Sequence, residues 1–176
     1  ECDTLLLSCG LIPENELSRS AGVALNPVTN GPAVNESLET SFPVFAAGNV
    51  LHVHDLVDYV SEEAASAGRH AAAYIRDGRQ TEGRVLPIRS ADGVRYTVPA
   101  AIRPAAIDPN GTVTIRFRVN AVYTDKRIAV YAGDRKIFSR RRNILAPGEM
   151  ETLKLPSGLL LDCPEASHIT VKLEDA

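Results

Sequence analysis

The sequence predicts a chain in two parts, an α/β segment over residues 1–80 and a small antiparallel β-sandwich over residues 81–176. Residues 1–80 contain short continuous apolar runs and one long helical stretch, which is typical of buried strands alternating with helices. Residues 81–176 contain several short stretches in which apolar and polar residues alternate, as in antiparallel strands with one face on a core. The charge changes at the same boundary, from four basic and eleven acidic residues to fifteen basic and eleven acidic residues, net charges of −7 and +4.

The first part begins with a predicted strand. Residues 4–9 form a continuous apolar run, which is typical of a strand buried on both faces, and Gly10 ends it. Cys9 lies in this run and is expected to be a small buried residue and not a nucleophile. Farther along, the sequence predicts a short helix and two more short strands, over residues 15–21, 23–25 and 44–47.

A long helix is expected next. Asp58 is a suitable N-cap, and the predicted helix runs from there to about Ile75, with Asp77-Gly78 as its stop. Glu62 and Glu63 are placed in its first turn, where the helix dipole favours anions. Small residues then form a stripe suited to close packing, at Ala64, Ala67, Ala71 and Ala72.

The second part is predicted to consist of strands. In Thr112–Val119, apolar residues alternate with polar ones, so one face of this strand should pack on a core. Residues 132–135 are expected to form a hairpin turn between two strands. Residues 150–155 and 168–173 also alternate, and residues 77–87 are interpreted as the linker between the two parts.

Composition excludes several classes of protein. No run approaches the roughly 18–20 apolar residues that span a bilayer, and the N-terminus carries no basic region of a signal peptide. The chain lacks an initiator Met and begins near an apolar strand pattern, so we expect it to be cut from a longer protein. Its three scattered Cys residues include no C-x-x-C pair, which argues against a dithiol centre and favours the reducing cytoplasm.

The most informative stretch is TSFPVFAAGNV, at residues 40–50. A short apolar strand ends there at Gly48, which lets a ligand approach the backbone closely. Asn49 then presents a hydrogen-bonding side chain at the carboxyl end of the strand, where open α/β sheets bind ligands. A plain strand-to-helix turn also fits these residues.

The same stretch resembles the second FAD-binding motif of the pyridine nucleotide-disulphide oxidoreductase family, T-S-x-P-x-(V/I)-(F/Y)-A-x-G-D. Upstream, residues 3–13 are similar to the family segment D-x-(V/L)-(L/I)-x-x-x-G-x-x-P-N, which returns the chain from the NAD-binding to the FAD-binding domain. Downstream, the spacing A-x-x-x-G-x-x-A-A of the closing helix is matched by Ala64, Gly68, Ala71 and Ala72. The resemblance covers about residues 1–78.

This resemblance implies that residues 1–80 are the incomplete C-terminal part of a Rossmann-like FAD-binding domain. The parent protein would be an enzyme, an FAD-dependent NAD(P)H oxidoreductase in which hydride passes between nicotinamide and flavin. The residues implied to contact FAD are Gly48, Asn49, Val50, Tyr59 and Val60. No catalytic residue is assigned, and no metal is expected.

Two features depart from the family. The acidic residue that hydrogen-bonds the ribityl chain of FAD is replaced by Asn49, which can still bind a hydroxyl but has lost the charge. The sequence also has no G-x-G-x-x-G turn, which supplies much of the binding energy of a dinucleotide. The chain alone is therefore expected to be inactive and not to retain FAD.

Residues 51–58, LHVHDLVD, contain two His and two Asp. Our first interpretation is a loop over the flavin crevice in which Asp58 caps the following helix. Two alternatives stay open: a metal site built from His52, His54 and Asp55, and a His that tunes the protonation of the flavin or its substrate.

Arg140, Arg141 and Arg142 form the basic cluster of the second part. Few aromatic residues lie among them, so nucleic-acid binding is not expected, and a solvated face or a docking patch for an acidic partner fits better. Docking of this cluster against the first part of the chain also fits, because the cluster is basic and the first part is acidic.

The second part would dock a redox partner or second subunit, or form a homodimer. The alternative function is a protein-interaction module without catalysis.

Overall fold

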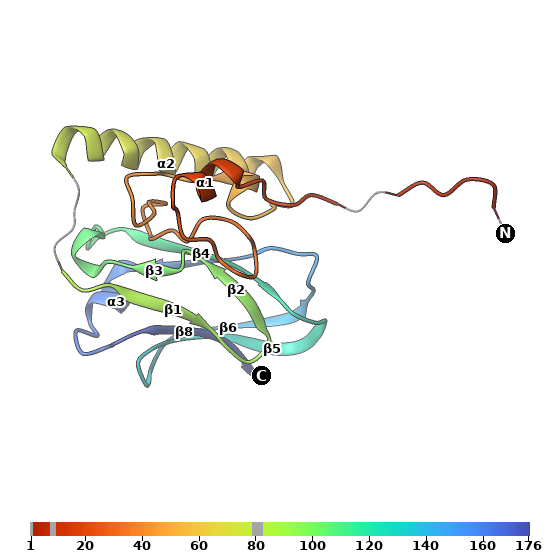
Figure 1. The fold of residues 1–176 in the computed structure, drawn as a ribbon. Coiled ribbons are helices and arrows are strands. Elements are labelled where there is room, and N and C mark those ends of the chain that lie inside the picture. The colour runs from red at the N-terminus through yellow and green to blue at the C-terminus, as the bar shows by residue number, and fades with distance from the viewer. Residues whose placement is uncertain (1, 8–9, 79–82) are drawn as a thin grey trace.

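The computed structural model describes residues 2–7, 10–78 and 83–176, and strands make up most of its regular structure (Figure 1). Within these ranges all eight strands follow residue 85, whereas the one long helix, α2 (Val57–Asp77), precedes them. The chain is therefore mixed α/β with mostly β content, as the sequence predicts in outline. None of the described helices is long and apolar enough to cross a membrane.

A three-stranded antiparallel sheet has the order β2-β4-β7 and comprises β2 (Val94–Val98), β4 (Thr112–Val119) and β7 (Glu151–Pro156). The alternation predicted for β4 is confirmed, because Val113, Ile115, Phe117 and Val119 are all buried in the main core. The remaining side chains of β4 include Arg116 and Arg118. These two arginines reach α2 and the loop before it, as described below.

The second sheet has five strands in the order β3-β1-β8-β5-β6: β3 (Ala101–Ile102), β1 (Leu86–Ser90), β8 (Ile169–Asp175), β5 (Tyr123–Ala132) and β6 (Arg135–Leu145). The hairpin between β5 and β6 is confirmed. Because β1 pairs in parallel with β8, this sheet is mixed and not purely antiparallel as predicted. Parallel neighbours need a long connection, and here the rest of the second part supplies it.

Both sheets contribute side chains to one apolar core, including Phe117 of β4, Val130 of β5 and Val171 of β8. Two short helical elements, η2 (Pro104–Ala106) and α3 (Ser157–Leu161), lie between the strands. A second, smaller core joins Tyr96 and Val98 of β2 to residues of the first part, Val34, Leu38, Ala46, Leu51 and Ala67. The two parts of the chain therefore share buried apolar contacts.

The first part differs most from expectation. Residues 3–7 form no strand, and Leu5, Leu6 and Leu7 are 75 %, 91 % and 73 % exposed. A strand needs a neighbouring backbone to hydrogen-bond, and no described segment pairs with this one, which extends away from the body (Figure 1). Cys9 lies outside the described residues.

Between residues 10 and 56, the regular structure is limited to the short helices α1 (Glu16–Ser20) and η1 (Gly48–Val50) and two isolated bridges, Leu25 with Pro32 and Glu39 with Phe45. The helix predicted over residues 15–21 is thus confirmed. The strands predicted over residues 23–25 and 44–47 are reduced to the two bridges. A Rossmann-like arrangement of this segment stays a prediction.

Helix α2 begins at Val57, two residues before the start that an N-cap at Asp58 would give. Leu56 is the N-cap with extended backbone, so Asp58 lies within the first turn and caps nothing. Its carboxylate still lies at the positive end of the helix dipole. The helix ends at Asp77 before Gly78, as predicted, and its buried residues are Glu63 and Ala67.

Candidate functional site

The turn at Gly48 has a backbone that favours glycine. Gly48 has φ of +72°, and its carbonyl accepts hydrogen bonds from the N–H groups of Leu51 and His52 at 2.9 and 3.2 Å. A Cβ at this position would lie 3.0 Å from Cγ1 of Val60 in the first turn of α2. Gly48 therefore brings the loop and the start of the helix into close contact.

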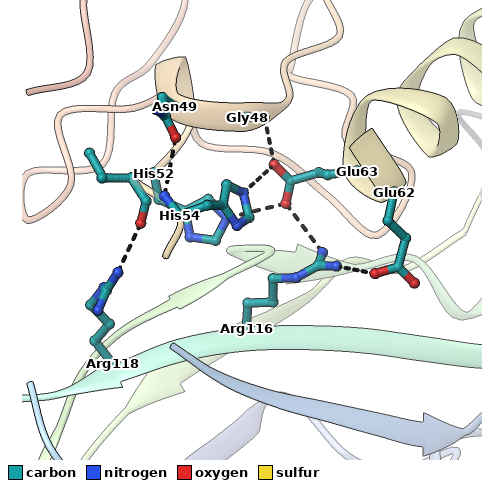
Figure 2. Close-up of polar contacts among 9 residues, drawn as sticks. Gly48, Asn49, His52, His54, Glu62, Glu63, Arg116 and Arg118 are labelled. Atoms are coloured by element: carbon teal, nitrogen blue, oxygen red, sulfur yellow. Dashed lines mark hydrogen bonds and ion pairs between the residues drawn. The ribbon is translucent and has the colours of Figure 1, made fainter. Parts of the chain in front are cut away.

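A buried carboxylate connects this turn to α2. Oε2 of Glu63 accepts hydrogen bonds from the Gly48 N–H at 2.7 Å and from Nε2 of His54 at 3.0 Å. Oε1 of the same carboxylate lies 3.1 Å from Nε2 of His52 and 3.3 Å from a terminal nitrogen of Arg116 (Figure 2). Four groups from three segments thus converge on one side chain that is 1 % exposed.

The hydrogen bonds decide the charge of Glu63. Burial alone would raise its pKa, but the bonds from His52, His54 and Gly48 outweigh burial and lower the pKa of Glu63 to about 2. Burial lowers the pKa of His52. Glu63 is therefore ionised at neutral pH, and His52 lies beside it as a neutral ring.

Because an ionised carboxylate can only accept, both histidines must donate to it from Nε2–H. Their rings lie edge to face with centroids 4.3 Å apart. Nδ1 of each ring is buried and has no hydrogen-bond partner among the described residues. The cluster of His52, His54 and Glu63, named the His–His–Glu cluster below, thus combines a fully bonded carboxylate with two unpartnered ring nitrogens.

The loop that carries the histidines is anchored by the second part of the chain. Arg118 of β4 donates to the Asp55 carboxylate and to the backbone carbonyl of Val53, the latter at 3.0 Å. The other carboxylate oxygen of Asp55 accepts from the Met150 N–H at 2.6 Å. Asp55 is therefore used to fix the loop and does not join His52 and His54.

This anchor predicts a measurable loss on removing the Asp55 side chain. The Asp55→Ala variant should lower the free energy of unfolding by about 1–2 kcal/mol, because the Met150 N–H and the Arg118 guanidinium both lose an acceptor. Urea denaturation measures the difference, with Asp58→Ala as the control for a carboxylate at the helix start. Equal losses in the two variants would contradict a specific anchor.

Another contact holds the start of the loop, at Val50. Nδ2 of Asn15, which is 3 % exposed, donates to the carbonyls of Val50 and Asn30 at 2.7 and 2.9 Å. Asn15 thus ties the Gly48 turn to the turn at residues 26–31. Nothing in the sequence near Asn15 signals this role, because its partners lie 35 and 15 residues away.

The residues expected to contact FAD lie in two adjoining elements. Gly48, Asn49 and Val50 form η1, and Tyr59 and Val60 lie in the first turn of α2. Asn49 is exposed, and its Oδ1 accepts the N–H of His54 at 3.1 Å. Arg116 lies over the Tyr59 ring, 5.8 Å from its centroid.

The residue that sequence reasoning missed is Glu63. It was expected at the helix start as a favourable anion, but it lies on the buried face of α2 one turn before Ala67. The signal that could have found it is a carboxylate in register with the small-residue stripe, since a buried carboxylate needs partners. A cavity of about 400 Å³ adjoins this carboxylate, and its lining includes Glu62, Glu63, Arg116 and His70.

The basic cluster of β6 is neutralised within the chain. Arg140 and Arg142 both donate to the carboxylate of Glu151, at 3.0 and 2.6 Å, and Arg141 pairs with Asp125. Docking of the acidic first part instead uses other arginines. Arg116 pairs with Glu62 and Glu63, and Arg103 pairs with Glu36 and Glu39.

Comparison of the chain with models of protein families, with curated proteins and with solved structures gives no match. The functional argument therefore depends on the residues themselves.

Proposed function

We propose that the chain forms one edge of the FAD site in an NAD(P)H-linked flavin oxidoreductase. The observation that carries the proposal is the Gly48-Asn49 turn, where a glycine with positive φ is followed by an exposed amide beside the N-terminus of α2. It occurs in the stretch that resembles the second FAD-binding motif of the pyridine nucleotide-disulphide oxidoreductases.

The Asn49 side chain can make one hydrogen bond to the cofactor. Oδ1 of Asn49 is engaged by the His54 N–H, and its amide nitrogen has no partner among the described residues. The exposed N–H groups of this amide can donate to a ribityl hydroxyl. A neutral hydrogen bond of this kind contributes about 1 kcal/mol, so the turn orients the cofactor and other segments must supply most of the affinity.

The start of α2 would support the flavin ring electrostatically. The N–H groups near Tyr59 and Val60 lie in the first turn, where the positive end of the helix dipole stabilises negative charge. Bound FAD would supply two-electron exchange with NAD(P)H. Glu63, His52 and His54 would keep the Gly48 turn in place, since the Glu63 carboxylate binds the Gly48 N–H directly.

The second part of the chain would serve as a docking or dimerisation domain for a redox partner, a second subunit or another copy. One observation also favours the alternative, an interaction module without catalysis. Strand β6 is an edge strand of the five-stranded sheet, and its Ile144 is 61 % exposed. Edge strands can pair with a strand of another chain.

The test is the visible absorbance spectrum of the purified full-length protein beside its Asn49→Asp and Asn49→Ala variants. We expect the parent to carry FAD and Asn49→Asp to keep it, because Asp still accepts the His54 N–H. Asn49→Ala should bind FAD about 5-fold more weakly, in line with the loss of one neutral hydrogen bond. A colourless parent that takes up no FAD would favour the interaction module.

A further inference from the structure

We infer that His52, His54 and Glu63 form a binding site for a divalent first-row transition metal ion such as Zn²⁺. One ligand atom from each residue, two ring nitrogens and a carboxylate oxygen, lies within 4.8 Å of the others. A set of two imidazoles and one carboxylate is a recurrent three-ligand set for Zn²⁺ and related ions, and it leaves coordination positions for water or a ligand.

The three ligands are arranged around one point before any metal binds. Nε2 of His52 and Nε2 of His54 approach different oxygens of the same carboxylate, at 3.1 and 3.0 Å (Figure 2). All three side chains are 1 % exposed, so little solvent water competes with them for the metal ion. The metal would replace the two hydrogen atoms that now lie between the rings and the carboxylate.

The elements that carry the ligands are fixed by contacts outside the cluster. Glu63 is on the long helix α2, and the N–H of His52 binds the Gly48 carbonyl at 3.2 Å. The loop that follows is anchored by Asp55 through Arg118 and the Met150 N–H. The sequence suggested Asp55 as the third ligand, but this anchor occupies it, and Glu63 takes that place.

The protons can be accounted for without an additional base. Glu63 is already ionised, and an imidazole frees Nε2 for the metal in the tautomer that carries its hydrogen on Nδ1. Both Nδ1 atoms are unpartnered among the described residues, so this tautomer breaks no existing hydrogen bond there. Glu63 also borders the neighbouring cavity of about 400 Å³, whereas His52 and His54 do not line it.

Arg116 is the positive charge in contact with the cluster, and it would repel a bound metal ion. Its contact with Oε1 of Glu63 is long, 3.3 Å, whereas its contact with Glu62 outside the cluster is 2.8 Å. The guanidinium is therefore held mainly by Glu62 and can stay there when the metal binds. Its positive charge lowers the affinity of the site but does not occupy the ligand positions.

The test is a titration of the metal-free chain with Co²⁺ alone, followed by its visible absorption. We expect saturation at one ion per chain, with the absorption of a low-symmetry nitrogen and oxygen site. Because even the loss of an outer-shell partner lowers metal affinity 10–100-fold, His54→Gln should bind at least about 100-fold more weakly. His168→Gln removes a partly exposed imidazole that is not part of the cluster, and this variant should bind like the parent.

Three results would overturn the proposal: no saturable binding by the parent, equal affinity of His54→Gln and His168→Gln, or the charge-transfer absorption of Co²⁺ bound to a Cys thiolate. Circular dichroism of each metal-free variant shows that it is folded, and Glu63→Gln is a second variant with the same expected loss. No flavin is present in the titration, so its outcome is independent of the proposed oxidoreductase.

Discussion

Replacing Glu63 with Gln is expected to lower the free energy of unfolding by about 3–5 kcal/mol, because several buried donors lose a charged acceptor and each such loss costs about 1–3 kcal/mol. The change places an amide N–H₂ group among donors from His52, His54, Gly48 and Arg116. Urea denaturation in the presence of a metal chelator measures the loss.

The neighbouring residue provides a matched control. Glu62 is on the same helix and also pairs with Arg116, but its side chain is 50 % exposed. Glu62→Gln should therefore cost less than about 1 kcal/mol. Similar losses for the two variants would show that the buried cluster contributes no more than a surface pair.

The pH dependence tests whether the charge of Glu63 causes the effect. Its pKa is about 2 in the folded chain against 4.5 as the ordinary value, so the unfolded chain binds this proton more readily. The stabilisation is fully present above pH 4.5 and is lost as the pH falls toward 2. The difference between the parent and Glu63→Gln should shrink over that window, and a constant difference would point to packing alone.

The parts of the fold that the sequence predicted correctly are those with a local pattern. The alternation in residues 112–119 is sufficient to define β4 and its buried face, and the turn residues define the β5–β6 hairpin. The long helix is found within two residues at each end. Patterns of this kind depend on neighbours along the chain, so they can be read without knowing the tertiary structure.

The features that were missed depend on partners far away in the sequence. The apolar run at Leu5–Leu7 predicts a buried strand only if another strand lies beside it, and no described segment does. Glu63 meets Arg116 across 53 residues, and Asp55 meets the Met150 N–H across 95. The sequence shows that these side chains can form ion pairs or hydrogen bonds, but not with which groups.

The uneven charge correctly indicated ion pairs between the two parts of the chain, but the sequence pointed to the wrong arginines. The acidic first part and the basic second part suggested that the two dock through opposite charges, with Arg140, Arg141 and Arg142 as the basic patch. Those three are neutralised by Glu151 and Asp125 within the second part. The arginines that reach the first part stand singly, at Arg103, Arg116 and Arg118. A run of arginines in the sequence therefore does not identify the residues that join the two parts. Those residues are single arginines that face carboxylates of the first part across partly buried contacts.

The Gly31→Ala substitution is expected to destabilise the chain by about 3 kcal/mol, the upper end of the usual cost of overpacking. A Cβ on Gly31 would lie 1.7 Å from the backbone oxygen of Leu51, and Leu51 is fully buried. A backbone group packed in this way cannot rotate aside as a side chain can. Thermal or urea unfolding measures the loss, and Gly68→Ala is the control. The space around a Cβ at Gly68 in α2 is open, so that change should be neutral or stabilise the helix by up to about 1 kcal/mol.

The same substitution also reaches the His–His–Glu cluster, because Leu51 directly precedes His52. If the Leu51 carbonyl moves to make room, His52 moves with it and its 3.1 Å contact with Glu63 lengthens. Gly31→Ala should therefore bind Co²⁺ more weakly than Gly68→Ala, although neither residue is a ligand. A Gly31→Ala protein as stable as the parent would mean that the turn at residues 26–31 does not pack on the loop, and that Asn15 alone positions it.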